Sequence, residues 1–253
     1  MRKIEPAERW LGISICLLAG LAVLAPALVQ PSHQHAFADQ RSWLGIPFAA
    51  DVFSNLAFAI GGLWGFKLLA GLSLPATQRR LAQLFFAGLV STAAASTWYH
   101  LQPNDAGLAI DRLGMGFAFA GLLGLAAAER ISARAGACLG EGVLLLAPLC
   151  VWVWASTGNV WPWLVLQFGG LALIAWMATR QADSHGLVVR WGVVILFYAA
   201  AKVLELNDHL VYDLSHQVLS GHTLKHLVAS FAVWPVYQAI ASIHSNQLPA
   251  SSK

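Results

Sequence analysis

Two pairs of polar residues, each spaced by four positions, stand out in an otherwise apolar chain. His222 and His226 open the last hydrophobic segment, Ser96 and His100 close an earlier one, and Asp111 follows His100 by eleven residues. Side chains four apart lie one turn above the other on one face of a helix. An ionisable side chain within a membrane helix is costly and usually functional. We therefore predict that these five residues meet at one metal site.

The chemistry that suits this set is metal-assisted hydrolysis. Three imidazoles plus one water form an open zinc site, in which His222 and His226 supply two nitrogens and His100 the third. Zinc lowers the pKa of its bound water to about 7. Asp111 is then the candidate base, and Ser96 could donate a hydrogen bond to the oxyanion or orient Asp111. The substrate would be an amide or an ester.

The composition places these residues in a membrane protein. The 253 residues are 58% hydrophobic and 11% charged, whereas soluble domains carry about 25% charged residues. The formal charge of +3 comes from scattered basic residues, so we expect no nucleic-acid partner. Three cysteines in apolar runs make no disulfide framework. A reaction at the bilayer boundary predicts a lipid substrate.

Eight segments are apolar enough to cross a membrane, since a crossing helix needs about 20 such residues. The first could be either a retained helix or a cleaved signal peptide, and seven helices would remain if it were cleaved. Short connections predict one compact all-α bundle. The segments are about 10–29, 51–74, 81–101, 108–128, 137–155, 160–178, 187–206 and 222–243.

Lysine and arginine in the connections predict the orientation, because they concentrate in cytoplasmic loops. With the N-terminus inside, the outer connections hold only Arg41. Both termini would then be cytoplasmic, and His100, Asp111, His222 and His226 would all lie near the outer face. The inner basic residues are Arg2, Lys3, Arg9, Arg79, Arg80, Arg130, Arg134, Arg180, Arg190 and Lys253.

Further polar residues share that outer level and allow two interpretations each. Asp51, Ser54 and Asn55 could shape the pocket or support a metal ligand, or they could cap a helix and bond neighbouring helices. Glu205 is spaced for an ion pair with Lys202, and could instead orient a ligand histidine.

Two cations also lie at the outer boundary. For Arg112 and Lys225 we expect side chains that extend to the lipid headgroups.

At these motifs the chain resembles the alkaline ceramidase family, most closely its bacterial members, often labelled alkaline phytoceramidases. That family belongs to a larger group of membrane hydrolases that includes the progestin and adiponectin receptors. The resemblance spans about residues 50–243. Its motifs are Asp51-Val52-Phe53-Ser54-Asn55-Leu56, Ser96-Thr97-Trp98-Tyr99-His100, Asp111-Arg112-Leu113-Gly114-Met115, Ala201-Lys202-Val203-Leu204-Glu205 and Gly221-His222-Thr223-Leu224-Lys225-His226-Leu227.

The resemblance implies zinc held by His100, His222 and His226, with Asp111 as the acid and base and Ser96 in support. The implied reaction is hydrolysis of the ceramide amide to a sphingoid base and a fatty acid. It also implies a seven-helix hydrolase core at residues 50–243, preceded by an added transmembrane helix and outer loop (1–49) and followed by a cytoplasmic tail (244–253). We expect a bacterial inner-membrane protein with a periplasmic active site.

Two features depart from the family. Its eukaryotic members carry an acidic calcium-binding stretch before the first family helix, whereas residues 30–50 hold only Asp39, so the sequence does not favour calcium. Many bacteria make little sphingolipid, so another N-acyl or O-acyl lipid is an alternative substrate.

Two other function classes remain open. One is a metal or proton transporter, although transporters place ionisable groups near the midplane. The other is a non-catalytic lipid-binding receptor or scaffold, because a fold can keep its site without the chemistry.

Overall fold

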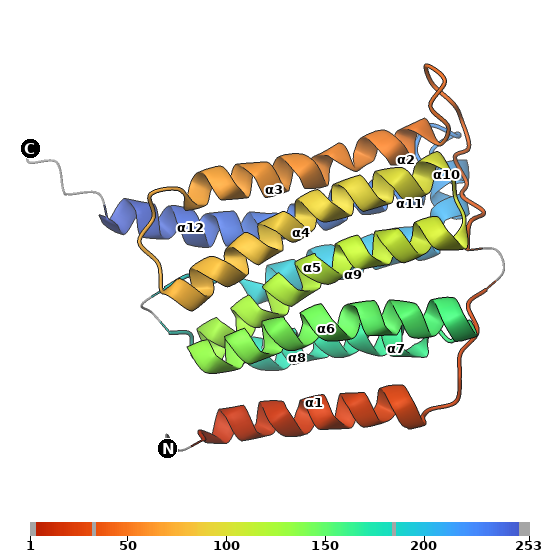
Figure 1. Cartoon of the computed structure of the whole chain (residues 1–253). Helices are drawn as coiled ribbons and strands as arrows, with labels where there is room; N and C mark the ends of the chain where they lie inside the picture. Colours follow the sequence, from red (N-terminus) through yellow and green to blue (C-terminus); the bar gives the residue numbers. More distant parts are fainter. Residues whose placement is uncertain (1–3, 32–33, 184–185, 248–253) are drawn as a thin grey trace, which may run out of the picture.

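The chain forms an all-α bundle of helices that run side by side (Figure 1). The computed structural model describes residues 4–31, 34–183 and 186–247, which form no strand beyond two isolated β-bridges. Arg2, Lys3 and Lys253, which contribute to the predicted orientation, lie outside them. The elements are α1 (Pro6–Leu24), α2 (Ala49–Ser54), α3 (Leu56–Leu69), α4 (Ala76–Leu101), α5 (Asp105–Arg130), α6 (Ala133–Thr157), α7 (Trp161–Leu164), the π-helix η1 (Val165–Gly169), α8 (Gly170–Ala178), α9 (Trp191–Leu206), α10 (Asp208–Leu214), α11 (Gly221–Ser230), the 3-10 helix η2 (Phe231–Val233) and α12 (Trp234–Gln247).

Within the described residues, seven helical stretches are long and apolar enough to cross a membrane. The predicted multi-pass membrane bundle is confirmed. The seventh predicted segment, 187–206, is helical only over the 16 residues of α9, which begins at Trp191 and ends at the predicted residue, Leu206. At 1.5 Å per residue these residues span about 24 Å, less than the roughly 30 Å hydrocarbon core. The chain then turns at Asn207 into the short helix α10.

Close packing of α4 against α5 fixes the start of the site. A Cβ added to Gly88 would lie 2.2 Å from the backbone nitrogen of Ala118, so only glycine permits this approach. The side chain of Asn104 accepts a hydrogen bond from the first turn of α5 and defines where that helix begins. His100 at the end of α4 and Asp111 near the start of α5 therefore lie at the same end of the bundle.

Helix α1 lies at the edge of the bundle, apart from the helices that carry the site (Figure 1). Leu11 is its one buried residue, and Leu18 packs against Gly169 of η1. This peripheral place suits the predicted division of the chain into 1–49, 50–243 and 244–253, which stays a prediction.

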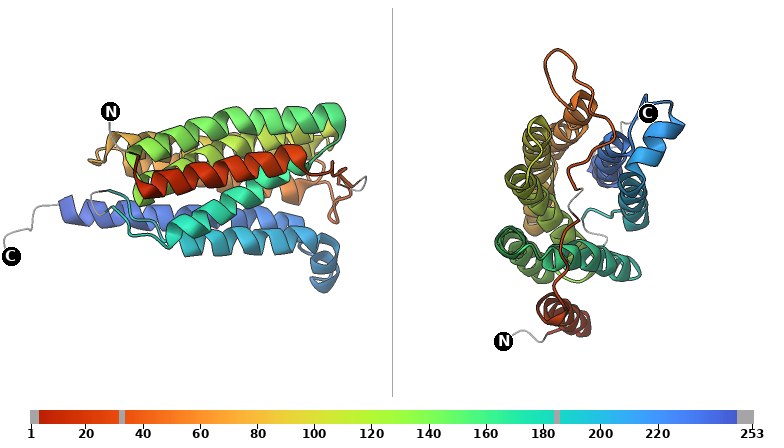
Figure 2. Two further views of the ribbon diagram at one scale, coloured as in Figure 1. Left: turned by 90° about the horizontal axis from the view of Figure 1, so that it is seen from below. Right: turned by 90° about the vertical axis from the view of Figure 1, so that its right-hand side faces the viewer.

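After α1 the chain crosses the end of the bundle where α4 ends and α11 begins (Figure 2, right). We call residues 34–48 of this crossing the strap. It leads into α2, which continues as α3 after a break at Asn55. The strap and four helix ends thus meet at one end of the molecule, which we call the site end.

Candidate metal centre

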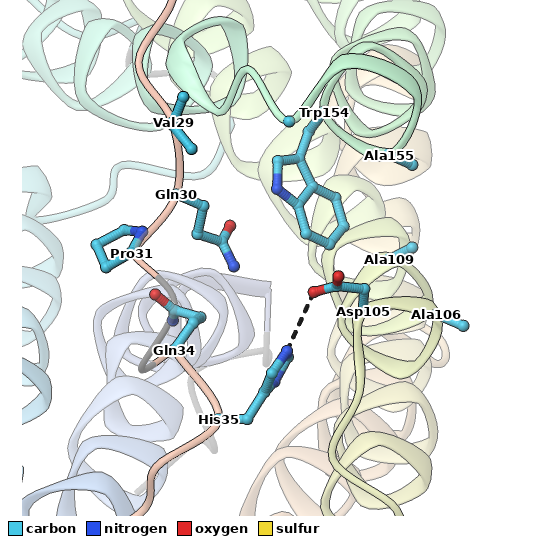
Figure 3. Close-up of a pocket in the computed structure, with 11 residues that line it drawn as sticks. Val29, Gln30, Pro31, Gln34, His35, Asp105, Ala106, Ala109, Trp154 and Ala155 are labelled. Carbon is cyan, nitrogen blue, oxygen red and sulfur yellow. Dashed lines mark hydrogen bonds and ion pairs between the residues drawn. The ribbon is translucent and has the colours of Figure 1, made fainter.

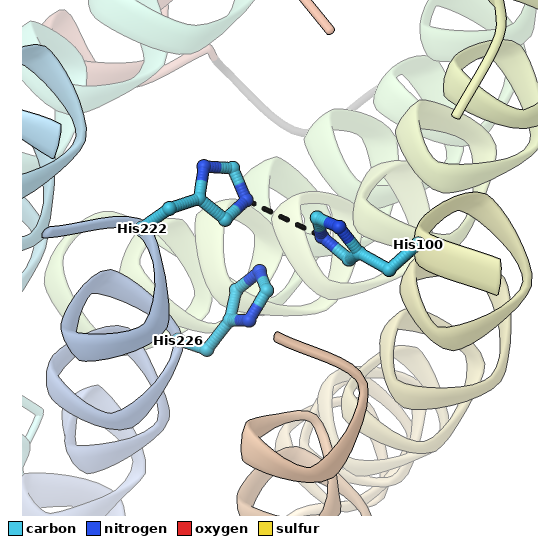
Figure 4. Close-up of side chains that lie close together, drawn as sticks. All are labelled: His100, His222 and His226. Atoms are coloured by element: carbon cyan, nitrogen blue, oxygen red, sulfur yellow. Dashed lines mark hydrogen bonds between the residues drawn. The ribbon is translucent and has the colours of Figure 1, made fainter. Parts of the chain in front are cut away.

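Three histidines converge at the site end (Figure 4). His100 comes from the last turn of α4, and His222 and His226 come from the first two turns of α11. All three are buried, and one nitrogen of each lies within 4.8 Å of those of the others. Their ring centroids are 4.9–5.1 Å apart. Among the described residues, this is the group of His, Cys, Asp or Glu side chains placed to hold a metal ion.

The start of α11 is built to hold this pair of histidines. Ser220 caps the helix, because its side chain accepts a hydrogen bond from the backbone nitrogen of Thr223 at 2.9 Å. Asp208 accepts a bond from the backbone nitrogen of His222 at 2.7 Å. A Cβ on Gly221 would lie 2.2 Å from the carbonyl oxygen of Leu204, so glycine lets α11 approach α9.

The distances and donors fit a zinc ion. The Nε2 atoms of His100 and His222 are 3.3 Å apart. Two nitrogens about 2.0–2.1 Å from one tetrahedral zinc lie about 3.3–3.4 Å apart, so this spacing matches. Neutral imidazoles are also the ligands that zinc, copper and iron sites share, and thiolates are absent from this group.

The hydrogen bonds of Ser54 fix the tautomer of His226. Ser54 Oγ donates its one hydrogen to the carbonyl oxygen of Asp51 at 2.9 Å. At its 2.8 Å contact with His226 Nδ1, Ser54 must therefore be the acceptor. The hydrogen of His226 lies on Nδ1, which leaves Nε2 with a free lone pair for a metal.

A buried carboxylate stands behind His100. Asp51 Oδ2 is 3.9 Å from His100 Nδ1, and neither atom has a hydrogen-bond partner among the described residues. Asp51 Oδ1 accepts a 2.6 Å bond from Thr223, and Asn55 donates to the Asp51 carbonyl at 3.0 Å. This arrangement resembles the carboxylate that orients a metal-bound histidine from behind.

The predicted cap in this segment is wrong, whereas the predicted hydrogen bonds to a neighbouring helix are present and join Asp51 and Ser54 to α11. Helix α2 begins at Ala49 after Phe48, and neither α2 nor α3 has a side-chain cap. Asp51, Ser54 and Asn55 instead make the buried contacts behind the histidines.

Ser96 and Asp111 lie beside the histidines as a pair of their own. The Ser96 hydroxyl donates to the Asp111 carboxylate, which interacts electrostatically with Lys225. Ser96 is buried and Asp111 is half-buried. Neither belongs to the group of metal-ligating atoms, and neither was predicted to be a ligand. A carboxylate placed next to the ligands, and not among them, remains free to exchange protons.

Lys225 points toward the histidines instead of extending to the headgroups as we expected. Its Nζ lies 3.0 Å from His222 Nε2 and 3.1 Å from Glu205 Oε1. Glu205 also pairs with Lys202, as predicted, at 2.5 Å. The sequence did carry a signal for this position, since Lys225 follows His222 by three residues and therefore shares its helix face.

Arg112 is buried as well, so its predicted exposure to headgroups is wrong. Its guanidinium stacks 4.1 Å from the ring centroid of Trp154 and donates to the side chain of Gln30. Cation–π contact and a neutral acceptor explain how this charge is held away from lipid.

The strap covers the histidines from outside the bundle. The ring of Phe37 packs 4.5 Å from His222 and 4.8 Å from His100, measured between centroids. Asp208 accepts a 2.9 Å bond from the backbone nitrogen of Ala38, and thus ties the strap to the start of α11. No sequence motif indicated Phe37, because the contact joins segments that are more than 60 residues apart.

An ion pair stiffens the strap further. Burial alone would raise the pKa of Asp39, but the hydrogen bonds and charge of Arg41 outweigh burial and hold this pKa below its ordinary value. Arg41 also donates to the carbonyl oxygen of Val218. The strap is thereby joined to the connection that precedes α11.

A cavity of about 520 Å³ lies next to the strap, between residues 29–31 and 34–35 on one side and the site ends of α5 and α6 on the other (Figure 3). His35 lines it and bonds Asp105 at 3.1 Å and the hydroxyl of Tyr99 at 2.8 Å. Tyr99 directly precedes His100 in the chain, so Tyr99 links the cavity-lining His35 to the histidine group. His33 lies outside the described residues.

No family model matches the chain, and no curated protein matches it. Among solved structures, the crystallographic structure of xanthorhodopsin, a light-driven ion pump with dual chromophore, matches at 14% identity and a TM-score of 0.48. The match covers 89% of this chain and 100% of that chain. At this score and identity the likeness says nothing of function.

Proposed function

We propose that this protein is a zinc-dependent membrane hydrolase that cleaves the amide bond of ceramide-like N-acyl lipids. The observation that carries the proposal is the buried group of His100, His222 and His226 at one end of a membrane bundle. The motif resemblance to alkaline ceramidases supports the choice of reaction. The products would be a sphingoid base, or a similar long-chain amine, and a fatty acid.

Each residue of the site would have a separate role in this reaction. When bound, zinc would lower the pKa of a water molecule and polarise the substrate carbonyl. Asp111 would accept a proton as water adds to the acyl carbon, and would return it to the nitrogen as the C–N bond breaks. Ser96 holds the Asp111 carboxylate in place by its hydrogen bond. Asp51 and Ser54 orient His100 and His226. Phe37 excludes bulk water above the ligands.

The proposed setting is a bacterial inner membrane, with both termini cytoplasmic and the site end periplasmic. Six arginines support this orientation, because they lie at the helix ends opposite the histidines and basic residues favour the cytoplasmic side. They are Arg79, Arg80, Arg130, Arg134, Arg180 and Arg190.

The test measures metal and hydrolysis together. Purified wild type should contain about one zinc per chain and release fatty acid from a ceramide. His222→Ala should lose both, because it removes a ligand, whereas His216→Asn is the matched control. His216 is exposed and has a φ of 54°, a conformation that asparagine adopts readily. Active protein without metal would contradict the proposal.

The two alternatives have less support. A transporter needs ionisable groups near the midplane, whereas these histidines occupy helix ends. A lipid receptor would bind ceramide and release no fatty acid, so the same assay separates it from a hydrolase.

A further inference from the structure

Two lysines share one carboxylate beside the candidate metal centre. Lys202 and Lys225 each bond one oxygen of Glu205, at 2.5 and 3.1 Å. The three side chains are 18–26% exposed, so the cluster is only partly solvated. Asp111 also interacts electrostatically with Lys225, so two acidic groups balance the two lysines. Ionisable groups near the bilayer boundary are costly and usually functional.

Metal binding would leave Lys225 with spare hydrogen-bonding capacity. Lys225 Nζ lies 3.0 Å from His222 Nε2, the same nitrogen that faces His100 at 3.3 Å. That nitrogen has one lone pair, which can serve the lysine or a metal but not both. Once that nitrogen binds a metal, Lys225 keeps only its hydrogen bond to Glu205, although an ammonium group has three hydrogens to donate.

The other acidic groups nearby are already engaged. Asp111 bonds Ser96, and Asp51 bonds Thr223. Asp208 accepts from two backbone nitrogens at the strap and the start of α11. In the described part of the chain, the hydrogen bonds of Lys225 go to Glu205 and His222, whereas its interaction with Asp111 is electrostatic only.

Tyr198 gives an independent indication of a missing partner. Its hydroxyl is buried and has no hydrogen-bond partner among the described residues. Tyr198 lies one turn before Lys202 on α9, so both side chains occupy one helix face. The Lys202 ammonium is 6.0 Å from the centroid of its ring. A buried donor without an acceptor is rare, and a bound ligand or water usually satisfies such a group.

We propose that Lys225, supported by Lys202 and Tyr198, recognises an anionic group that the substrate carries close to its scissile acyl bond. This inference rests on the proposed hydrolase function and narrows its substrate class. A neutral ceramide offers only hydroxyls at this position. An N-acyl lipid with a carboxylate or phosphate beside the amide would accept charge-assisted hydrogen bonds from the spare donors of Lys225.

The test compares two lipids with one acyl chain, N-palmitoylglycine and N-palmitoylethanolamine, on zinc-loaded protein in detergent. Wild type should favour the anionic lipid by about tenfold or more in kcat/KM, the value of one charge-assisted hydrogen bond. Lys225→Met should bring that ratio near one, chiefly through KM for the anionic lipid. Lys225→Arg, which keeps the charge, should restore part of the preference.

Lys67→Met is the matched control, because Lys67 is exposed on α3 and should leave the ratio unchanged. Zinc content is measured for each variant, so that loss of metal is not mistaken for loss of recognition. Equal turnover of both lipids by wild type, or a preference that survives Lys225→Met, would overturn the inference.

A binding measurement separates this inference from the proposed function. If no lipid is hydrolysed, the hydrolase proposal fails, and tryptophan fluorescence still reports binding of the two lipids. Tighter binding of N-palmitoylglycine that Lys225→Met abolishes would sustain the anion site by itself. Equal binding of both lipids would overturn it. Inorganic phosphate that binds while neither lipid does would also overturn it, since the site would then serve a free anion.

Discussion

Replacement of Ser54 by alanine tests how the proposed metal centre is assembled, because Ser54 lies outside the candidate ligand group yet bonds one of its histidines. Its hydroxyl donates to the Asp51 carbonyl and accepts from His226 Nδ1. The Asp51 carbonyl keeps a second donor, Asn55, so Ser54→Ala leaves that oxygen satisfied. The main loss falls on His226.

The magnitude follows from the hydrogen bond that the His226 N–H loses. That loss costs about 0.5–1.5 kcal/mol, because the Asp51 backbone carbonyl remains as a partner of His226. The ring can avoid that cost by moving its hydrogen to Nε2, but that tautomer cannot bind a metal there. Either outcome weakens binding, and loss of a group behind a ligand typically lowers metal affinity 10–100-fold, about 1.4–2.8 kcal/mol.

The assay is competition for zinc between the purified protein and a chelator of known affinity. Ser230→Ala is the control. Ser230 is a buried serine on α11, the helix that carries His226, and its hydroxyl bonds only a backbone carbonyl. In a double-mutant cycle, Ser54→Ala should have no further effect once His226 is alanine. An affinity for zinc that is the same in Ser54→Ala and wild type would refute the tautomer argument.

Two further predictions concern the scaffold around the site. Gly221→Ala should lower the melting temperature in detergent, since the new Cβ would lie 2.2 Å from the Leu204 carbonyl oxygen and overpacking typically costs about 1–3 kcal/mol. The control is Gly142→Ala, which should be neutral or stabilising because a Cβ there meets nothing within 4 Å. Equal changes in melting temperature for the two variants would contradict the packing argument. Phe37→Ala should speed the transfer of zinc to a water-soluble chelator, because it removes the ring that covers the histidines. Removal of a buried phenylalanine costs about 3–5 kcal/mol, whereas each hydrogen bond that holds the strap contributes only about 1 kcal/mol. An unchanged transfer rate would show that the strap does not control access.

The ligand group was accessible to sequence reasoning because it depends on short-range geometry and topology. His222 and His226 share a face by their spacing alone. Loop charges then assigned His100 and Asp111 to the same end of the bundle, and the helix ends do meet there.

What the sequence left undecided depends on helix rotation and long-range contact. Arg112 and Lys225 were assigned to headgroups by depth, but rotation turns both inward, toward Trp154 and His222. Phe37 reaches the site only because the strap folds back over the bundle, and no local pattern encodes that path. Helix α9 begins at Trp191 and not at residue 187, because the apolar run extends beyond the helix, and hydropathy does not detect the short helix α10.

Two aspartates near the histidines, Asp51 and Asp111, can be assigned different roles in the proposed hydrolase from their contacts alone. Asp51 is fully buried, bonds Thr223 and stands behind His100, so it has no route to a substrate atom. Asp111 is half-buried, bonds only the Ser96 hydroxyl among the described side chains, and lies outside the ligand group. A proton carrier must reach both water and the leaving nitrogen, whereas an orienting carboxylate must stay fixed. The same residue type therefore serves as a support at position 51 and as the candidate acid and base at position 111, because α2 buries the first and α5 leaves the second accessible.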